Sequence, residues 1–330
     1  MAIRSIMAQA MVLGALSATL LVACGGGGEP QANDKLSDNA ATSYSANATV
    51  VGSDATSALD TALLTAMQLA PGAISAASAP NSREQAQTVS VGTLTCAGGG
   101  TATMTISGAG TVAELNGRLD AGEIYQITYN QCSGANGQAA LNGALAMTVN
   151  SASSNIGGNS DTTVTFSTSS LAATLPRGSV SFNGTVMVQR VVTVSGNSTS
   201  VSTQVSTSSL AVATNFNNRT GQFTLSGVNL TRQANFLSGV LQSASYNGAH
   251  TLSAVLTNLS YSYTVATQGG TAFDANGVPT QGGWVITLPN RTLTITVASG
   301  SVTIAIDDGK NGSVDRSFTI PVAALIAGAG

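Results

Sequence analysis

His250 is the only histidine of the chain, so any chemistry that needs a histidine must use it. A Ser-His-Asp nucleophile system requires such a base, yet no Gly-x-Ser-x-Gly turn flanks any serine. By strand alternation His250 shares a face with Tyr246, Leu252 and Leu256, which is typical of a packed residue rather than a base. These residues favour a noncatalytic protein.

The sequence also lacks suitably placed residues for hydrolysis by paired carboxylates. It needs two acids on facing strands, but Asp161 and Asp274 are the only carboxylates between Glu123 and Asp307. We therefore expect neither an enzyme nor a cofactor.

One acidic cluster could bind a metal ion. Asp307, Asn311 and Asp315 stand at the first, fifth and ninth positions of what resembles a degenerate calcium loop. Calcium takes about six to eight oxygen ligands, whereas Gly309 occupies the third position and Phe318 replaces the final glutamate. The competing interpretation, a hairpin loop rich in turn-forming residues, fits better.

Of the three cysteines, Cys96 and Cys132 lie in the body of the chain and form an even pair when Cys24 is set aside. A disulfide between them would stabilise the fold by about 3–4 kcal/mol, mainly by restricting the unfolded chain. Two buried free thiols are the alternative. No second ligand type accompanies either cysteine in the sequence, so a metal site is not expected there.

Aromatic residues make up only 4% of the chain, so their positions are informative. Tyr246, His250 and Trp284 are the candidates for contacting a hydrophobic ligand inside a rolled sheet. The competing use of such side chains is to fill the widest parts of the core. Arg190 is unexpected on the face of Val188: either that face opens to solvent there or the guanidinium finds a buried partner.

The first residues have the order of an export signal: Arg4, an apolar segment at 6–20, then Leu21-Val22-Ala23-Cys24. The apolar segment is shorter than the roughly 20 residues that a membrane-spanning helix needs. It resembles the signal of bacterial lipoproteins, in which the cysteine is acylated. The resemblance implies a lipid anchor on Cys24, since two or more acyl chains hold a protein stably. Gly25, the residue after this cysteine, favours the outer membrane over the inner.

A second resemblance lies in the body of the chain. Residues 127–132, Ile-Thr-Tyr-Asn-Gln-Cys, followed by Leu141-Asn142-Gly143, are similar to uncharacterised β-rich envelope proteins of proteobacteria. This resemblance covers a small part of the chain and implies no activity.

Charge limits the partners. Only 8% of the residues are charged, against about 25% in ordinary soluble proteins. The net charge is −3, and loss of Arg4 with the signal would leave ten basic against 14 acidic residues. Nucleic-acid binding needs clustered basic residues, and the sequence has none. The expected partner is outer-membrane lipid, reached through Cys24; the sequence does not identify a protein or hydrophobic small-molecule partner.

The composition divides the chain into four parts. We predict a signal peptide at 1–23, a flexible tether at 24–56, a short helix with a linker at 57–87, and an antiparallel β domain at 88–330. The tether has almost no large apolar residue, so it could not bury enough surface to become ordered. Ser57 and Asp60 resemble a capping box, and Pro71 ends the helix.

Past Thr88 the hydrophobic pattern has period two, with β-branched residues and turn clusters. Runs of about 14 residues on both sides of Ser195-Gly196-Asn197-Ser198 predict a long hairpin, since strands usually have about five or six. We expect an all-β fold, a large curved antiparallel meander that is half-barrel or barrel-like, with one short N-terminal helix. Other strands are predicted at 101–107, 123–130, 139–150, 162–170, 222–232, 250–265, 283–288, 292–298, 302–306 and 314–320.

A large apolar residue followed by Asn or Ser and then Gly recurs irregularly in this domain. The glycines are Gly117, Gly143, Gly184, Gly227 and Gly248. Glycine inside a strand usually marks a bulge or a close backbone approach, so we predict that these residues line up as a crease that bends the sheet. The alternative is that each forms a separate hairpin turn.

Three functions are compatible with these observations. The favoured one is a lipid-anchored cell-envelope protein with a noncatalytic structural or interaction role. The second is a carrier of a lipid or another hydrophobic ligand in a rolled β-sheet. The third is a surface adhesin, for which the Ser- and Thr-rich strands are suitable.

Overall fold

The computed structural model describes residues 35–42, 44–45, 89–108, 119–133, 140–154, 158–175, 178–216, 219–238, 240–256, 259–273 and 279–326. Its elements are β1 (Val89–Thr95), β2 (Thr101–Gly108), β3 (Glu123–Ser133), β4 (Ala140–Ser154), β5 (Ser160–Leu175), β6 (Gly178–Ser195), β7 (Ser198–Phe216), β8 (Arg219–Leu237), β9 (Val240–Leu256), β10 (Leu259–Thr267), β11 (Thr271–Phe273), β12 (Pro279–Thr287), β13 (Arg291–Ala298), β14 (Ser301–Asp308), β15 (Arg316–Pro321) and α2 (Val322–Ile326). The predicted signal peptide, with Cys24, and the predicted helix at 57–70 lie outside the described residues.

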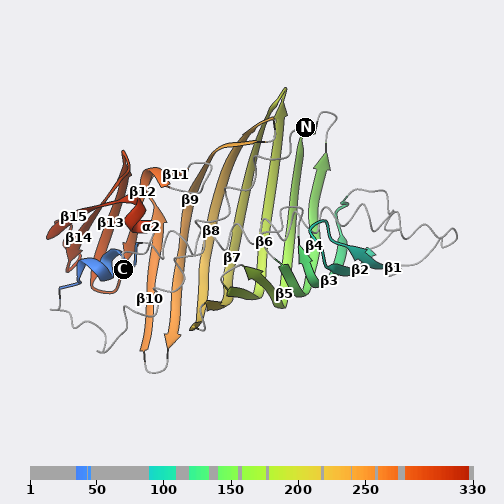
Figure 1. Cartoon of the computed structure of the whole chain (residues 1–330), viewed down its shortest axis with the longest axis horizontal. Helices are drawn as coiled ribbons and strands as arrows, with labels where there is room; N and C mark the ends of the chain where they lie inside the picture. The colour runs from blue at the N-terminus through green and yellow to red at the C-terminus, as the bar shows by residue number, and fades with distance from the viewer. Residues whose placement is uncertain are drawn as a thin grey trace.

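All 15 strands belong to one sheet, and each pairs with its neighbours in the antiparallel sense. The order follows the chain from β1 to β15, except that β11 sits beside β9 and β12. Figure 1 shows the long central strands side by side, with β1 at one end and β13–β15 at the other. The prediction of a large antiparallel meander is therefore confirmed. Its order has two ends among the described strands, so a closed barrel is not formed by them.

The predicted long hairpin is present. β6 has 18 residues and β7 has 19, and they pair from Gly178 and Phe216 down to Ser195 and Ser198. Gly196 lies in the connecting turn with φ 59°, a left-handed conformation that glycine adopts without strain.

One face of the sheet carries the apolar residues, and we call it the inner face. Along β6, Phe182, Val186 and Val188 are buried, whereas Asn183, Thr185 and Met187 between them are exposed. The same alternation continues through the neighbouring strands. The hydrophobic effect thus determines which face is inner, because every second side chain of each strand must leave water together.

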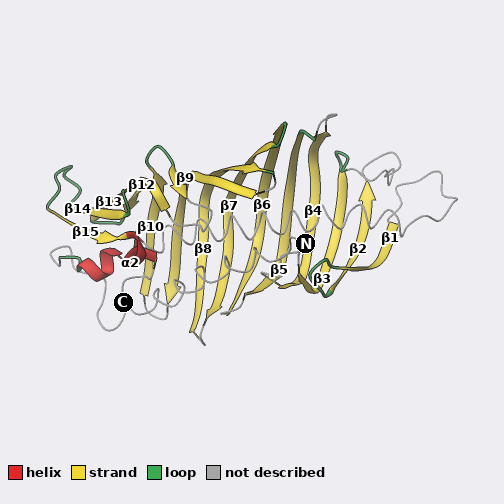
Figure 2. Ribbon diagram, turned by 45° about the horizontal axis from the view of Figure 1, so that its top comes forward, coloured by secondary structure: helices red, strands yellow, loops and turns green. Residues whose placement is uncertain are grey.

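A line of irregularities crosses the middle of the sheet. The pairing register shifts in five of the six successive strand pairs from β3/β4 to β8/β9, and only β7/β8 keeps a single register. In β3, β5, β7 and β8 the buried positions change parity near these points: in β7, for example, from Val205 to Leu210. Bulges of this kind bend and twist a sheet, and Figure 2 shows the long strands curving along their length.

The recurrent glycines lie on this line, as predicted. Gly143, Gly184 and Gly248 are inside β4, β6 and β9, so the hairpin-turn alternative is wrong for them. A Cβ atom on any of the three would lie within 3 Å of a carbonyl oxygen of the adjacent strand, and all three have positive φ. Gly227 is also on the line, in β8. Gly117 lies outside the described residues.

Threonine hydroxyls fasten two of the bulges in the same way. The Thr168 hydroxyl donates to Ala144 O at 2.8 Å, and the Thr207 hydroxyl donates to Thr185 O at 2.7 Å. In each case the acceptor follows a crease glycine. Both threonines belong to the identical hexapeptide Ser-Thr-Ser-Ser-Leu-Ala, at 167–172 and 206–211. This repeat marks two copies of one bulged hairpin unit, β4–β5 and β6–β7.

The prediction of an unstructured tether at 24–56 is wrong for the part that the structure describes. Residues 38–42 and 44–45 are helical, and we call them the N-terminal helix. Ser37 caps it, because its hydroxyl accepts the Ala40 N–H at 3.2 Å. Leu36 and Ala41 are both buried, in the positions of a hydrophobic staple. The composition of this segment did not predict the helix, because the helix buries only a few apolar residues of its own. The sheet supplies the other side of the apolar contact.

The N-terminal helix packs against strands that are distant from it in the sequence. Tyr44 contacts Tyr263 of β10 edge to face, with ring centroids 5.5 Å apart. Asp38 forms an ion pair with Arg316 of β15. In Figure 1 this blue helix lies beside the red C-terminal strands. The C-terminal end of the sheet is therefore covered by the earliest described part of the chain.

Candidate functional site

The three residues predicted to contact a ligand come from β9 and β12. Tyr246 and His250 are four residues apart on β9, with Gly248 between them, and share the inner face. Trp284 lies on β12 opposite Thr267 of β10. Since β10 pairs with both β9 and β12, the structure brings all three residues to one region of the inner face.

His250 is surrounded by apolar neighbours. Its partner on β10 is Val265, the next inner residue along β9 is Leu252, and the bulge of β8 that faces it contains Val228. All three are buried, and His250 itself is 5% exposed. This burial lowers the pKa of His250 to about 4, so its imidazole is neutral near pH 7.

Both ring nitrogens of His250 lack a hydrogen-bond partner within the described ranges. The sequence predicted a packed histidine, and packing is what the structure has, but a packed histidine normally has at least one satisfied nitrogen. No serine or carboxylate of the described residues is hydrogen-bonded to it. Each unpaired buried group costs about 1–3 kcal/mol.

Trp284 has the same property. It is 2% exposed, and its indole Nε1 has no hydrogen-bond partner in the described part of the chain. Its inner-face neighbours on β12 and β13 are Ile286 and Ile295, both fully buried. A buried indole N–H is usually bonded, so this donor is unusual as well as buried.

A row of polar residues crosses the inner face next to this region, and sequence reasoning had singled out only two of its members, Arg190 and Tyr246. Register pairs each member with the next across six strands. The row consists of Thr162, Arg190, Thr203, Arg232, Tyr246 and Thr271. Both arginines are half-buried, and Thr203 between them is fully buried. No local pattern could have revealed the row, because its members meet only through the pairing of separate strands.

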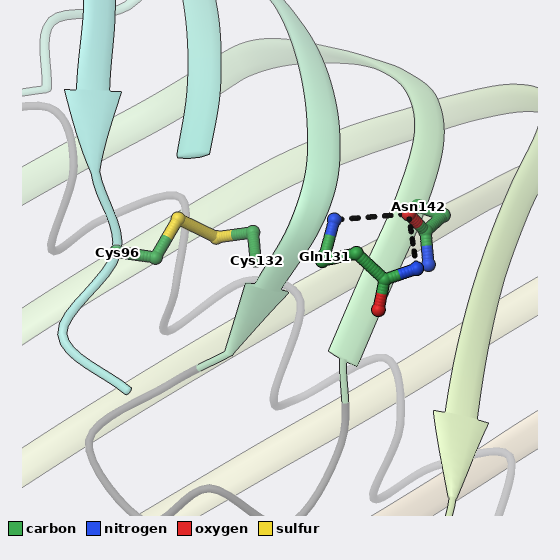
Figure 3. Close-up of a disulfide and its surroundings, with 4 residues drawn as sticks. All are labelled: Cys96, Gln131, Cys132 and Asn142. Carbon is green, nitrogen blue, oxygen red and sulfur yellow. Dashed lines mark hydrogen bonds between the residues drawn. A yellow bond between two sulfur atoms is a disulfide. The ribbon is translucent and has the colours of Figure 1, made fainter. Parts of the chain in front are cut away.

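The predicted disulfide between Cys96 and Cys132 is present, with the Cα atoms 5.4 Å apart. Cys96 follows β1 and Cys132 lies beyond the bulge of β3, so the bond joins two strands that flank β2. Figure 3 shows the disulfide beside Gln131, whose backbone N–H and side-chain amide both donate to Asn142 Oδ1. The disulfide and these bonds hold the first bulge of the line.

The acidic loop at 307–315 connects β14 and β15 as a hairpin. The two carboxylate oxygens of Asp307 accept the N–H groups of Asn311 and Gly312, at 3.1 and 2.9 Å. Asp315 Oδ2 accepts the N–H of Asp308 at 2.7 Å, while Asp308 pairs with Arg291. These carboxylates shape the turn.

Among the described residues, no group of three or more His, Cys, Asp or Glu side chains is placed to hold a metal ion. The candidate calcium ligands Asp307, Asn311 and Asp315 instead lie in a hairpin loop, which is the interpretation that the sequence favoured.

Comparisons with protein-family models, curated proteins and solved structures found no match for this chain. A search of the described helices for one long and apolar enough to cross a membrane also found none.

Proposed function

We propose that this protein is a lipid-anchored, noncatalytic protein of the cell envelope, whose sheet serves as a scaffold for binding or structure. The observation that carries the proposal is the Cys96–Cys132 disulfide. Disulfides persist in oxidising compartments and are rare in the cytosol. With this pair bonded, Cys24 is the one remaining cysteine, and it stands in the Leu21-Val22-Ala23-Cys24 context of a lipoprotein signal.

The test is metabolic labelling of cells with a radioactive or alkyne-tagged fatty acid. We expect label on the wild-type protein and none on Cys24→Ser, with the mature amino terminus at residue 24. Cys96→Ser is the matched control, because it removes a different cysteine and leaves the label in place. Equal labelling of wild type and Cys24→Ser, or an unprocessed amino terminus, would contradict the anchor.

A second candidate is the carrier of a hydrophobic ligand, and one observation favours it. Two buried polar side chains, His250 and Trp284, lie unsatisfied among apolar residues of the inner face, as described above. Ligand sites commonly combine an apolar lining with a few polar groups. Mass spectrometry of organic extracts from the purified protein is the test. A stoichiometric lipid-like molecule would support the carrier, and its consistent absence would contradict it.

A further inference from the structure

Around β9, β10 and β12, the inner face has two buried polar side chains, His250 and Trp284, whose nitrogens the described residues leave without a hydrogen-bond partner. His250 offers one donor and one acceptor in its neutral form, and Trp284 offers one donor. All three groups are buried, and none is satisfied by the described residues. Native proteins leave few such groups, and a missing ligand or water is a usual explanation. Their occurrence in one region is therefore more informative than either would be alone.

The register gives their relative placement. His250 is opposite Val265 and Trp284 is opposite Thr267, two residues away on the same strand, β10. Two strand spacings separate β9 from β12, which is about 10 Å between backbones. Both side chains stand on the inner face, so they flank β10 from its two sides. A molecule on the inner face of β10 at Val265 and Thr267 would meet both, beyond the position at which Tyr44 contacts Tyr263.

The surroundings specify the chemistry of such a molecule. Val228, Leu252, Val265 and Ile286 are apolar and buried, and they would contact hydrocarbon. A charged group would be desolvated there beside a neutral imidazole, which is costly. The nearest arginine by register, Arg232, is opposite Tyr246, four residues along β9 from His250. Hydroxyl, ester and amide groups can satisfy His250 and Trp284 without bringing a charge.

We infer that His250 and Trp284 hold the uncharged polar head of an amphiphile whose hydrocarbon chain lies on the inner face of β9, β10 and β12. This inference deepens the carrier function proposed above and rests on it. It assigns the head group to hydroxyl, ester or amide chemistry and the tail to the apolar residues around β10.

The chain has a single tryptophan, so fluorescence reports on this site alone. The experiment titrates the purified full-length protein with a monoacylglycerol brominated on its acyl chain, which quenches tryptophan at short range. The unbrominated molecule serves as the probe control. We expect saturable quenching by the brominated probe and none by the control.

Variants connect the quenching to His250. His250→Leu removes both ring nitrogens and breaks no hydrogen bond of the described residues, so it is expected to fold, as circular dichroism would verify. We expect it to weaken probe binding about tenfold or more. His250→Gln, which keeps a donor and an acceptor, is expected to bind more tightly than His250→Leu. Ser253→Ala, on the opposite face of β9, is the matched control and is expected to bind like wild type.

The possible results distinguish a failure of the proposed His250 site from a failure of the carrier function. Equal affinity of wild type and His250→Leu would overturn the site, as would quenching only by a brominated fatty acid or phosphatidylglycerol, which would show a charged head. In both of those cases the carrier function would survive. If none of the three brominated probes quenches saturably, the carrier function fails as well.

Discussion

The long-stranded part of this sheet, β3 to β9, and its short-stranded C-terminal end, β12 to β15, are built differently. From β3 to β9 the strands are long, and every adjacent pair except β7/β8 contains a register shift. From β12 to β15 the strands have six to nine residues and pair without interruption. Long strands accumulate twist, and bulges with glycines let the sheet bend where that twist concentrates. Short strands need no such relief, and this end is instead covered by the N-terminal helix.

The disulfide and the threonine hydrogen bonds that connect neighbouring strands lie in the bulged part of the sheet. The disulfide sits at the first bulge, and the Thr168 and Thr207 hydroxyls fasten later ones. A bulge leaves backbone groups without ladder partners, and these devices supply them or tie the strands together. The regular end relies on fully buried side chains such as Leu293, Ile295 and Ile304.

The largest expected loss of stability comes from removing the disulfide in the bulged part of the sheet. Replacing both Cys96 and Cys132 with alanine is expected to lower the free energy of unfolding by about 3–4 kcal/mol, because the unfolded chain regains the entropy of a 36-residue loop. Urea denaturation measures the change. A loss below about 1 kcal/mol would mean that the bulged end does not depend on this bond.

The second effect is at the crease. Gly248→Ala is expected to cost about 3 kcal/mol, because its Cβ would meet the Asn229 carbonyl of β8 and the backbone has φ 137°. Gly196→Ala is the control: it also has positive φ, but nothing lies within 4 Å of its Cβ position. We expect that variant to cost about 1–2 kcal/mol in the same denaturation assay. Equal costs would remove close packing as the reason for glycine in the crease.

The third effect concerns His250, at the boundary between the two ends. Its pKa is about 4 in the folded protein and about 6.5 in the unfolded chain. Between these values the unfolded state binds more protons, so stability is complete above pH 6.5 and falls as the pH approaches 4. From pH 7.5 to pH 5 the expected loss is about 2 kcal/mol.

Comparing urea denaturation of wild type and His250→Leu isolates this contribution. Other groups titrate in both proteins, so only the difference between their pH profiles belongs to His250. We expect that difference to change by about 2 kcal/mol over the interval. Parallel profiles would show that His250 is accessible to protons when folded.

The smallest effect tests the threonine bonds of the bulges. Thr207→Val keeps the shape of the side chain but removes the hydroxyl that bonds Thr185 O and the Ser209 N–H. We expect a cost of about 1–2 kcal/mol, with a similar cost for Thr168→Val in the other hexapeptide copy. Thr193→Val, exposed on the regular part of β6, is the control and is expected to change stability by less than about 0.5 kcal/mol. Indistinguishable values for Thr207→Val and Thr193→Val would refute the role of these bonds.

Several features were predictable because their signals are local. Alternation along 180–194, the turn at Gly196 and the pairing of Cys96 with Cys132 follow from periodicity, turn chemistry and cysteine count. The recurrent Asn-Gly steps predicted the crease. The change of parity between Val205 and Leu210, and the repeated hexapeptide at 167–172 and 206–211, would have located two bulges as well.

Other features were missed because their causes are not local. The N-terminal helix has few apolar residues of its own, and it is held by Tyr263 and Arg316, more than 200 positions away. His250 and Trp284 were named together as ligand candidates, but their unpaired nitrogens could not be foreseen. Whether a buried polar group is satisfied depends on every element around it.

The amino-acid order alone determined the class of fold and the inner face of each strand, since period two commits alternate side chains to one side whatever the strand pairs with. Tertiary structure decided which inner residues meet. Strand register placed Arg190 in a row with Thr203 and Arg232, and put His250 and Trp284 on either side of β10. These neighbours depend on hydrogen bonds between strands, and the sequence of one strand does not contain them.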